Sequence, residues 1–231
     1  MRVLLAIWLA FVAPIAGQQN AAARAARQWR ETHERAILGE LISFLSIPNL
    51  ADDAGNLHRN AEAVGAMLEH RGVKVQMLET AGSPPLVFGE IRTPGAIRTL
   101  VFYAHYDGQA VDPKDWTAPP FQPQLSPDGP VDPEWRIFAR SSSDDKASIV
   151  AMATALDGLR SARVPLRSNV KFVFEGEEEQ GSPHLEEILA RNKDLLRGDV
   201  WLICDGPIHP SRRQQIVFGA RGFTTIDITV Y

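Results

Sequence analysis

The sequence predicts an α/β fold in which a mostly parallel sheet is flanked by helices. Segments with strand character alternate with segments of helical periodicity from residue 21 to residue 204. This alternation is typical of parallel strands joined by crossover helices. A histidine and several acidic residues directly follow three of the predicted strands, and functional groups of such sheets lie just past the carboxyl ends of the strands.

Length, charge and the first residues restrict the class of protein. The 231 residues carry a net charge of −4, and scattered Lys and Arg offer no basic stripe for nucleic acid. Residues 1–19 have the layout of a signal peptide, with Arg2, an apolar run and then small residues. The run is shorter than the roughly 20 residues that a membrane-spanning helix needs. We therefore expect a secreted or periplasmic protein with no stable span after cleavage; an uncleaved anchor is the alternative.

Apolar residues at helical spacing predict four helices. The first covers residues 21–47 and is ended by Pro48. The others cover residues 57–70, 146–159 and 184–196.

Apolar runs bounded by turn residues predict the strands. They cover residues 73–77, 86–91, 99–104, 169–174 and 200–204. Residues 111–132, rich in Pro and Asp, form a loop. Residues 215–218 and 224–231 have strand character without a helix between them, so we expect a change of domain near residue 213.

One histidine and several carboxylates should meet at the carboxyl edge of this sheet. His105 follows the third strand, Asp205 follows the last strand, and Asp144 precedes a helix. Such crowding of negative charge is unfavourable unless a cation neutralises it. Histidine and carboxylate are zinc ligands, and two ions about 3.5 to 4 Å apart need a bridging carboxylate, for which we predict Asp144.

Three further acidic residues have predicted roles around the metals. Asp107 lies two residues after His105 and can accept a hydrogen bond from its second ring nitrogen, which orients the ring. Of the neighbours Glu178 and Glu179, only one can readily face a metal. The other is free to act as a general base.

Each residue also has an ordinary structural interpretation. His105 can be a strand-end histidine, Ser141-x-x-Asp144 a helix cap, the acidic run before Gln180 a solvated loop, and Asp205-Gly206 a turn. Their common position at strand ends and at a helix start favours a metal site.

Three ordered motifs resemble a known family. LVFYAHYD at 100–107, RSSSDDK at 140–146 and EGEEEQGS at 175–182 resemble the dizinc metallopeptidases that include carnosinase, bacterial dipeptidases, glutamate carboxypeptidases and acetylornithine deacetylase or succinyl-diaminopimelate desuccinylase. The resemblance covers about residues 30–231. It implies a zinc-exopeptidase-like catalytic domain, incomplete in residues 20–212, and the first strand of a lid or dimerisation domain in residues 213–231.

The resemblance also implies the role of each site residue. One metal is bound by His105 and Asp205, Asp144 bridges, Glu179 binds the second metal, Glu178 is the general base and Asp107 orients His105. It implies a cis peptide between Asp144 and Asp145, two divalent ions that are Zn, or Mn or Co, and a homodimer for the full-length form.

The implied activity is that of an exopeptidase or dipeptidase acting on small peptides. The same machinery acting on acyl-amino acids, as a deacetylase or desuccinylase, is the close alternative, and an inactive truncated copy is another. We expect this chain to be an N-terminal fragment that is inactive by itself, because the family's later histidines would lie beyond Tyr231.

The sequence departs from the family at three positions where glycine is usual. They are occupied by Ala139, Ser141 and Ala147. Any of them that needs a positive φ would be strained. The remaining histidines match no ligand position: His33, His58, His70, His184 and His209.

Overall fold

The computed structural model describes residues 20–123, 131–132, 134–206, 209–211, 213, 215–219, 222, 224 and 226–230. The signal peptide expected in residues 1–19 lies outside this part of the chain, so export stays a prediction. In the part described, none of the helices has the length and apolar character needed to cross a membrane.

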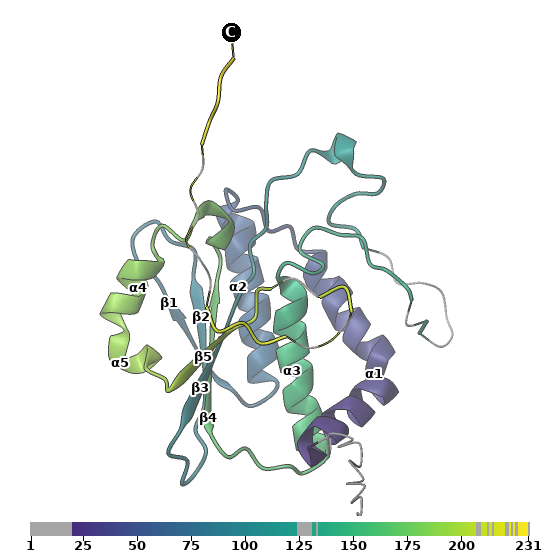
Figure 1. The fold of residues 1–231 in the computed structure, drawn as a ribbon, viewed down its shortest axis with the longest axis vertical. Helices are drawn as coiled ribbons and strands as arrows, with labels where there is room; N and C mark the ends of the chain where they lie inside the picture. Colours follow the sequence, from purple (N-terminus) through teal and green to yellow (C-terminus); the bar gives the residue numbers. More distant parts are fainter. Residues whose placement is uncertain are drawn as a thin grey trace, which may run out of the picture.

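A five-stranded sheet forms the centre of the molecule (Figure 1). Its strands are β1 (Lys74–Leu78), β2 (Leu86–Ile91), β3 (Thr99–His105), β4 (Asn169–Glu175) and β5 (Val200–Ile203), in the spatial order β1-β2-β4-β3-β5. β3 runs parallel to both β4 and β5, whereas β2 runs antiparallel to both β1 and β4.

The predicted α/β class is confirmed, but the sheet is mixed rather than mostly parallel. The connections 79–85 and 92–98 are the reason. A parallel crossover needs a dozen or more residues, so these short links can only reverse the chain direction. β2 is therefore the one strand of the sheet that runs the opposite way, and β3, β4 and β5 are neighbours whose carboxyl ends lie at the same edge.

The helices begin and end where the sequence supplies caps and breaks. They are α1 (Ala21–Leu45), α2 (Ala54–Glu69), α3 (Lys146–Ser161), α4 (Leu185–Arg191) and α5 (Lys193–Leu196), with short 3-10 helices at Pro113–Asp115 and Glu178–Gln180. The Asp53 side chain accepts a hydrogen bond from Asn56 N at 3.0 Å. This N-cap starts α2 three residues before the predicted Leu57.

The single helix predicted for residues 184–196 is divided into α4 and α5. Asn192 separates them with a non-helical backbone (φ −113°, ψ 24°), and its side-chain amide donates to Ile188 O at 2.9 Å. An asparagine side chain competes with the helix for backbone hydrogen bonds in this way. The apolar periodicity that predicted one helix continues past Asn192, although the helix breaks there.

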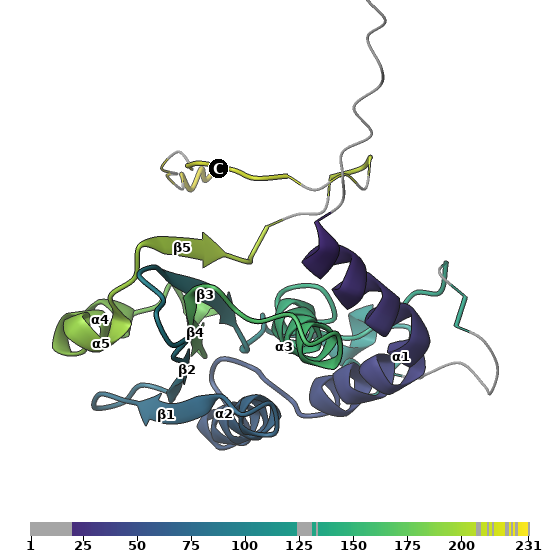
Figure 2. The same cartoon turned by 90° about the horizontal axis from the view of Figure 1, so that it is seen from below.

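Helices cover the sheet from both sides (Figure 2). Helices α1, α2 and α3 pack on one face, and α4 and α5 on the other. Successive strand residues alternate between the two cores: Val87 and Phe172 face the α1–α3 side, while Phe88 and Val173 face α4 and α5. The sheet is thereby fixed between two apolar layers, and its carboxyl edge remains open for polar side chains.

The strands predicted for residues 215–218 and 224–231 are not formed in the described residues of these segments. Residues 215–219 and 226–230 have no strand pairing among the described residues. Ile216, Phe218 and Ile228 are exposed there, and Figure 1 shows the end of the chain extending away from the sheet. Strand character alone does not form a strand, because the backbone groups need a hydrogen-bonded neighbour.

Candidate active site

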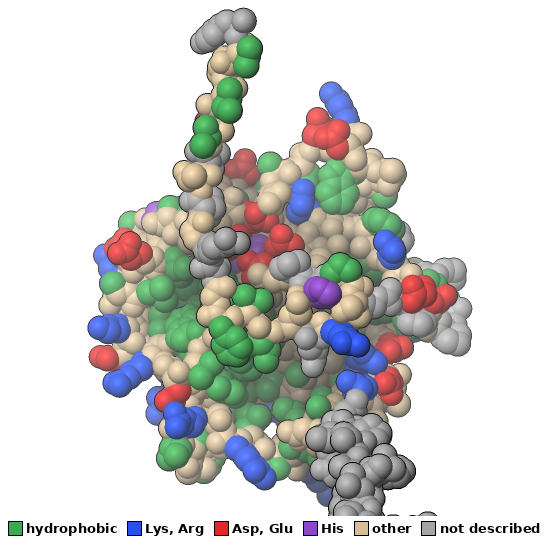
Figure 3. Space-filling model, viewed as in Figure 1, with side chains coloured by type: hydrophobic (Ala, Val, Ile, Leu, Met, Phe, Trp, Pro, Cys, Tyr) green, Lys and Arg blue, Asp and Glu red, His purple; other side chains and the backbone are tan. Residues whose placement is uncertain are grey.

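The three parallel strands and helix α3 bring the predicted site residues to one edge of the sheet. His105 is the last residue of β3, Asp205 follows β5 by two residues, and Asp144 precedes α3 by two. Glu178 and Glu179 lie on the 3-10 helix that follows β4. Figure 3 shows acidic side chains gathered around histidine atoms near the centre of one face.

His105 is the centre of this group. Its Nδ1 lies 3.1 Å from Asp107 Oδ1, and its Nε2 lies 2.9 Å from Asp144 Oδ1. His105 and Asp107 are fully buried, whereas 62% of the Asp144 side chain is exposed. The ring is therefore fixed through Nδ1 by a buried carboxylate, and its Nε2 faces the solvent-exposed carboxylate of Asp144.

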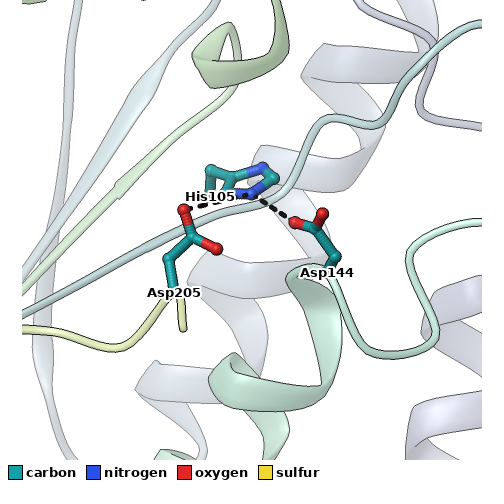
Figure 4. Close-up of side chains that lie close together, drawn as sticks. All are labelled: His105, Asp144 and Asp205. Atoms are coloured by element: carbon teal, nitrogen blue, oxygen red, sulfur yellow. Dashed lines mark hydrogen bonds and ion pairs between the residues drawn. The ribbon is translucent and has the colours of Figure 1, made fainter. Parts of the chain in front are cut away.

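Two further carboxylates approach the same nitrogen. Glu178 Oε2 and Asp205 Oδ2 each lie 3.9 Å from His105 Nε2. Figure 4 shows Asp144 and Asp205 directed at His105 from two sides. One nitrogen of an immobilised ring thus meets carboxylates from three separate elements.

Two overlapping groups have donor atoms close enough to share an ion. In His105, Asp144 and Asp205, and likewise in His105, Glu178 and Glu179, the donors lie within 4.8 Å of one another. No other histidine in the described part of the chain belongs to such a group. The structure thus brings together the four residues predicted as ligands. His105 belongs to both groups, Asp144 and Asp205 belong to one, and Glu179 belongs to the other.

The loop carrying the two glutamates is tied to the histidine through Asp107. Its Oδ1 contacts His105 Nδ1, while its Oδ2 accepts a hydrogen bond from Glu179 N at 3.0 Å. The Glu179 side chain is held in turn by Gln109 Nε2 at 2.9 Å from Oε2. Asp107 therefore sets the position of both the ring and the glutamate turn.

The electrostatics show an excess of negative charge. Burial by itself lowers the pKa of His105, but the hydrogen bond and charge of Asp107, with Asp145 and Asp205, raise it to about 10. Burial raises the pKa of Asp145 to about 7 and also raises that of Glu178. The protein thus favours a cation at this edge, either a proton or a metal ion.

The segment before α3 has an unusual backbone. The peptide between Asp144 and Asp145 is cis, as the resemblance implied. Ser141 has a φ of 61°, whereas Ala139 and Ala147 are not among the residues with a positive φ. Of the three departures from glycine, only Ser141 occupies a conformation that favours glycine.

The sequence did not predict the roles of two residues that shape the site. Asn49, fully buried, donates hydrogen bonds to Tyr106 O and Ser141 Oγ. Lys146, also buried, donates to Phe44 O and Ile47 O at 2.9 Å. A Lys directly after two aspartates is a recognisable signal, but nothing near Asn49 in the sequence indicates its role.

The donor set fits a divalent metal. Zn²⁺ takes nitrogen and oxygen donors of histidine and carboxylate. Zinc-bound histidines also usually donate their other ring N–H to a carboxylate, as His105 does to Asp107. Burial is the main cause of the raised pKa of Asp145 and Glu178, and neighbouring carboxylates add to it; a cation among these carboxylates would favour their charged forms.

Comparison with known proteins agrees with this chemistry. Residues 101–227 match the family model described as peptidase family M20/M25/M40. The Cys-Gly metallodipeptidase dug1 of Schizosaccharomyces pombe is 27% identical over 172 residues, which are 72% of this chain and 35% of that protein. The human Beta-Ala-His dipeptidase is 31% identical over 142 residues, which are 60% of this chain and 27% of that protein.

A solved structure shows the same fold. The M20 family metallo-carboxypeptidase Sso-CP2 of Sulfolobus solfataricus superposes with a TM-score of 0.68 at 33% identity, over 77% of this chain and 39% of that one. The chain thus spans about a third of the length of the relatives it matches.

Proposed function

Because the chain belongs to peptidase family M20/M25/M40, we propose that it forms part of the active site of a metal-dependent hydrolase that cleaves peptide bonds in dipeptides or at a C-terminus. One observation carries the proposal. His105 Nε2, on a buried ring whose Nδ1 is bound by Asp107, faces carboxylates from three elements within 4 Å. A metal at this point would satisfy all of them.

The chain's own residues would hold two ions. His105 and Asp205 would bind one, Asp144 would bridge, and Glu179 would bind the second. Asp144 suits a bridge because its side chain is 62% exposed and only one of its oxygens, Oδ1, is the atom that lies 2.9 Å from His105 Nε2. Zn²⁺ fits these donors, and Mn²⁺ or Co²⁺ would be accepted by the same atoms. Bound ions supply a water of lowered pKa and polarise the substrate carbonyl.

Glu178 would serve as the general base. It lies on the same turn as Glu179, but its side chain stays about one-third exposed, with Oε2 directed toward His105 Nε2. Burial raises its pKa above the ordinary value for glutamate, which brings the carboxylate closer to the pH at which it must accept and return a proton. Glu178 would take the proton of the attacking water and return it to the leaving amine.

Asp107 would act as a positioning residue. Its two oxygens hold His105 Nδ1 and Glu179 N, so it fixes the tautomer of the ring and the location of the glutamate turn. Carboxylate partners of this kind maintain metal affinity. The dipeptidases among the relatives support small peptides as the proposed substrate class.

The neighbouring glutamates provide the test. Zn²⁺ binding is measured by calorimetry on this chain, and hydrolysis on the protein expressed from the complete reading frame that contains it. We expect Glu179→Gln to weaken Zn²⁺ binding, because the amide is a poorer ligand. Glu178→Gln should retain Zn²⁺ but lose turnover of a dipeptide panel, because the amide cannot accept a proton.

Each outcome has a defined meaning. Exchanged phenotypes would reverse the roles of the two glutamates. Hydrolysis of N-acyl amino acids but not of dipeptides would replace the peptidase with an amidohydrolase. A chain that binds no Zn²⁺, with His105→Ala indistinguishable from the unaltered chain, would refute the metal site.

A further inference from the structure

A buried asparagine connects the two segments that carry the site. Asn49 lies in the link between α1 and α2, far from the site in sequence. Its Nδ2 donates to Tyr106 O at 2.7 Å and to Ser141 Oγ at 2.8 Å. Its main-chain oxygen accepts a hydrogen bond from Gly108 N at 2.8 Å. One residue therefore makes three hydrogen bonds to the segments that hold His105 and Asp144.

These contacts are adjacent to the ligands. Tyr106 lies between His105 and Asp107, Gly108 follows Asp107, and Ser141 precedes Asp144 by three residues. A further bridge pairs Leu50 with Gly108. The segment that begins at Asn49 thus lies along the 105–108 turn, while its side chain reaches the segment before α3.

Ser141 is the partner that makes this link specific. Its φ of 61° is a conformation that L-residues rarely adopt, and its side chain is buried. The hydroxyl accepts from Asn49 Nδ2 and faces Asp107 O at 3.4 Å. A glycine at this position would adopt the same backbone without strain but would leave one of the two donor hydrogens of Asn49 without an acceptor.

Packing leaves little freedom around the hydroxyl. A Cβ added at Gly108 would lie 2.6 Å from Ser141 Oγ and 3.1 Å from the Arg140 side chain. The two segments therefore approach each other closely, and the Asn49–Ser141 hydrogen bond lies within this contact.

The chain before Asn49 is fixed to α3. Lys146, the first residue of α3, is buried, and its Nζ donates to Phe44 O and to Ile47 O at 2.9 Å each. Asn49 thus follows a segment that is anchored independently of the two ligand-bearing segments, so its side chain can hold them in position.

We infer that Asn49 is a positioning residue that, through Ser141, fixes the distance between the His105–Asp107 turn and the segment carrying Asp144. The inference rests on the proposed metal site. It accounts for serine at a left-handed position: the hydroxyl gives Asn49 an acceptor that glycine lacks. Loss of the link should let the two ligand-bearing segments separate. The affinity for any ion that is bound by both His105 and Asp144 should then fall.

The test compares Asn49→Ala with Asn60→Ala in the full chain. Asn60 is a matched control, because it is also fully buried and its Nδ2 also makes two hydrogen bonds, to Pro48 O and Asn56 O, neither of which belongs to a ligand-bearing segment. The readouts are Co²⁺ affinity, from the visible spectrum of the bound ion, and amide hydrogen exchange followed by mass spectrometry. Both use conditions in which circular dichroism shows each variant folded.

Asn49→Ala should weaken Co²⁺ binding by about 10-fold or more, as for the loss of other residues that orient ligands. It should also speed amide exchange in residues 105–108 and 139–145 before other regions. Asn60→Ala should lower the unfolding temperature without changing Co²⁺ affinity beyond about 2-fold. Ser141→Gly should resemble Asn49→Ala, and the double variant should be no worse than either, since both remove one link.

Equal effects of Asn49→Ala and Asn60→Ala on Co²⁺ affinity would overturn the inference and leave Asn49 with a general structural role. Additive losses in the double variant would show that Asn49 does not act through Ser141. If the unaltered chain binds no Co²⁺, the proposed function fails. In that case the exchange measurement still tests whether Asn49 holds the two segments together. Unchanged amide exchange of residues 105–108 and 139–145 in Asn49→Ala would refute that role.

Discussion

Replacing Glu175 by glutamine should change the pH dependence of stability in a direction that the structure specifies. Glu175 ends β4 and is buried; one of its oxygens accepts hydrogen bonds from Tyr103 and Ser182. Its Oε2 is buried without a partner among the described residues. Burial, opposed by the two hydrogen bonds and reinforced by the charges of Asp107 and Glu177, raises the pKa of Glu175 from 4.5 to about 7.

The sign follows from proton linkage. Between pH 4.5 and 7 the folded chain retains a proton on Glu175 that the unfolded chain has released. Stability from this group is therefore complete below pH 4.5 and is lost as the pH rises through 7. A pKa difference of this size corresponds to about 3 kcal/mol. Glutamine has the shape of the protonated acid but does not titrate, so the stability of the variant relative to the unaltered chain should rise by up to that amount from pH 4.5 to pH 8.

Urea unfolding in EDTA at pH 4.5, 6 and 8 measures the effect. The stability of the variant relative to the unaltered chain should rise between pH 4.5 and 8; any cost of burying the unpaired amide N–H groups is the same at each pH. In a protein of this size about 3 kcal/mol is roughly 6 to 12 °C in Tm. Glu177→Gln is the control for loss of a carboxylate charge from the same segment: the two Glu177 oxygens lie 2.8 and 2.9 Å from His184 N and Nδ1, so this variant disturbs existing contacts and should not gain stability at pH 8. A stability difference for Glu175→Gln that stays constant from pH 4.5 to 8 would refute the reasoning.

Three further predictions concern packing and metal. Gly176→Ala should destabilise the chain by about 1 to 3 kcal/mol and weaken Zn²⁺ binding, because the added Cβ would lie 2.5 Å from ring atoms of buried Tyr106, next to His105; unchanged Zn²⁺ affinity in calorimetry would contradict it. Gly158→Ala should cost a similar amount, since its Cβ would lie 2.7 Å from Ala26 Cα, but should leave Zn²⁺ affinity unaltered, because it is distant from the site along α3. Excess Zn²⁺ should raise the Tm, and EDTA should reverse the rise, because an ion bound only by the folded chain stabilises it; an unshifted Tm would count against the metal site.

Most of the fold could be predicted because the chain marks its own boundaries. Strand β2 has the predicted limits, and α1 ends at Leu45, shortly before Pro48. Strand order was not accessible in the same way. The link 92–98 shows that β2 and β3 run in opposite directions, but nothing in it shows that β4 lies between them. That arrangement depends on which apolar faces pack together, which local patterns do not specify.

The residues that meet at the site were predictable for a related reason. His105 ends one strand, and Glu178 and Asp205 follow two others, so a sheet in which these strands are parallel neighbours brings the three residues together. Asn49 was missed because its role depends on contacts with residues 57 and 92 positions away. Ser141 lies between these cases: the sequence marked it as one of three departures from glycine, and only the structure shows that it has a positive φ and which hydrogen bond accompanies it.

The strand order explains why the site has one histidine surrounded by carboxylates. β3 lies between β4 and β5 and is parallel to both, so its last residue, His105, has the turn after β4 on one side and Asp205 on the other. β2 runs the opposite way and presents its first residues at this edge, where Pro85 O accepts a hydrogen bond from Tyr106. It therefore contributes support and no ligand. If β2 ran parallel to β4, the segment after Ile91 would reach this edge instead, and the hydrogen bond that holds Tyr106 would be lost. The mixed sheet that the sequence did not predict thus accounts for a site built from three strands and one helix.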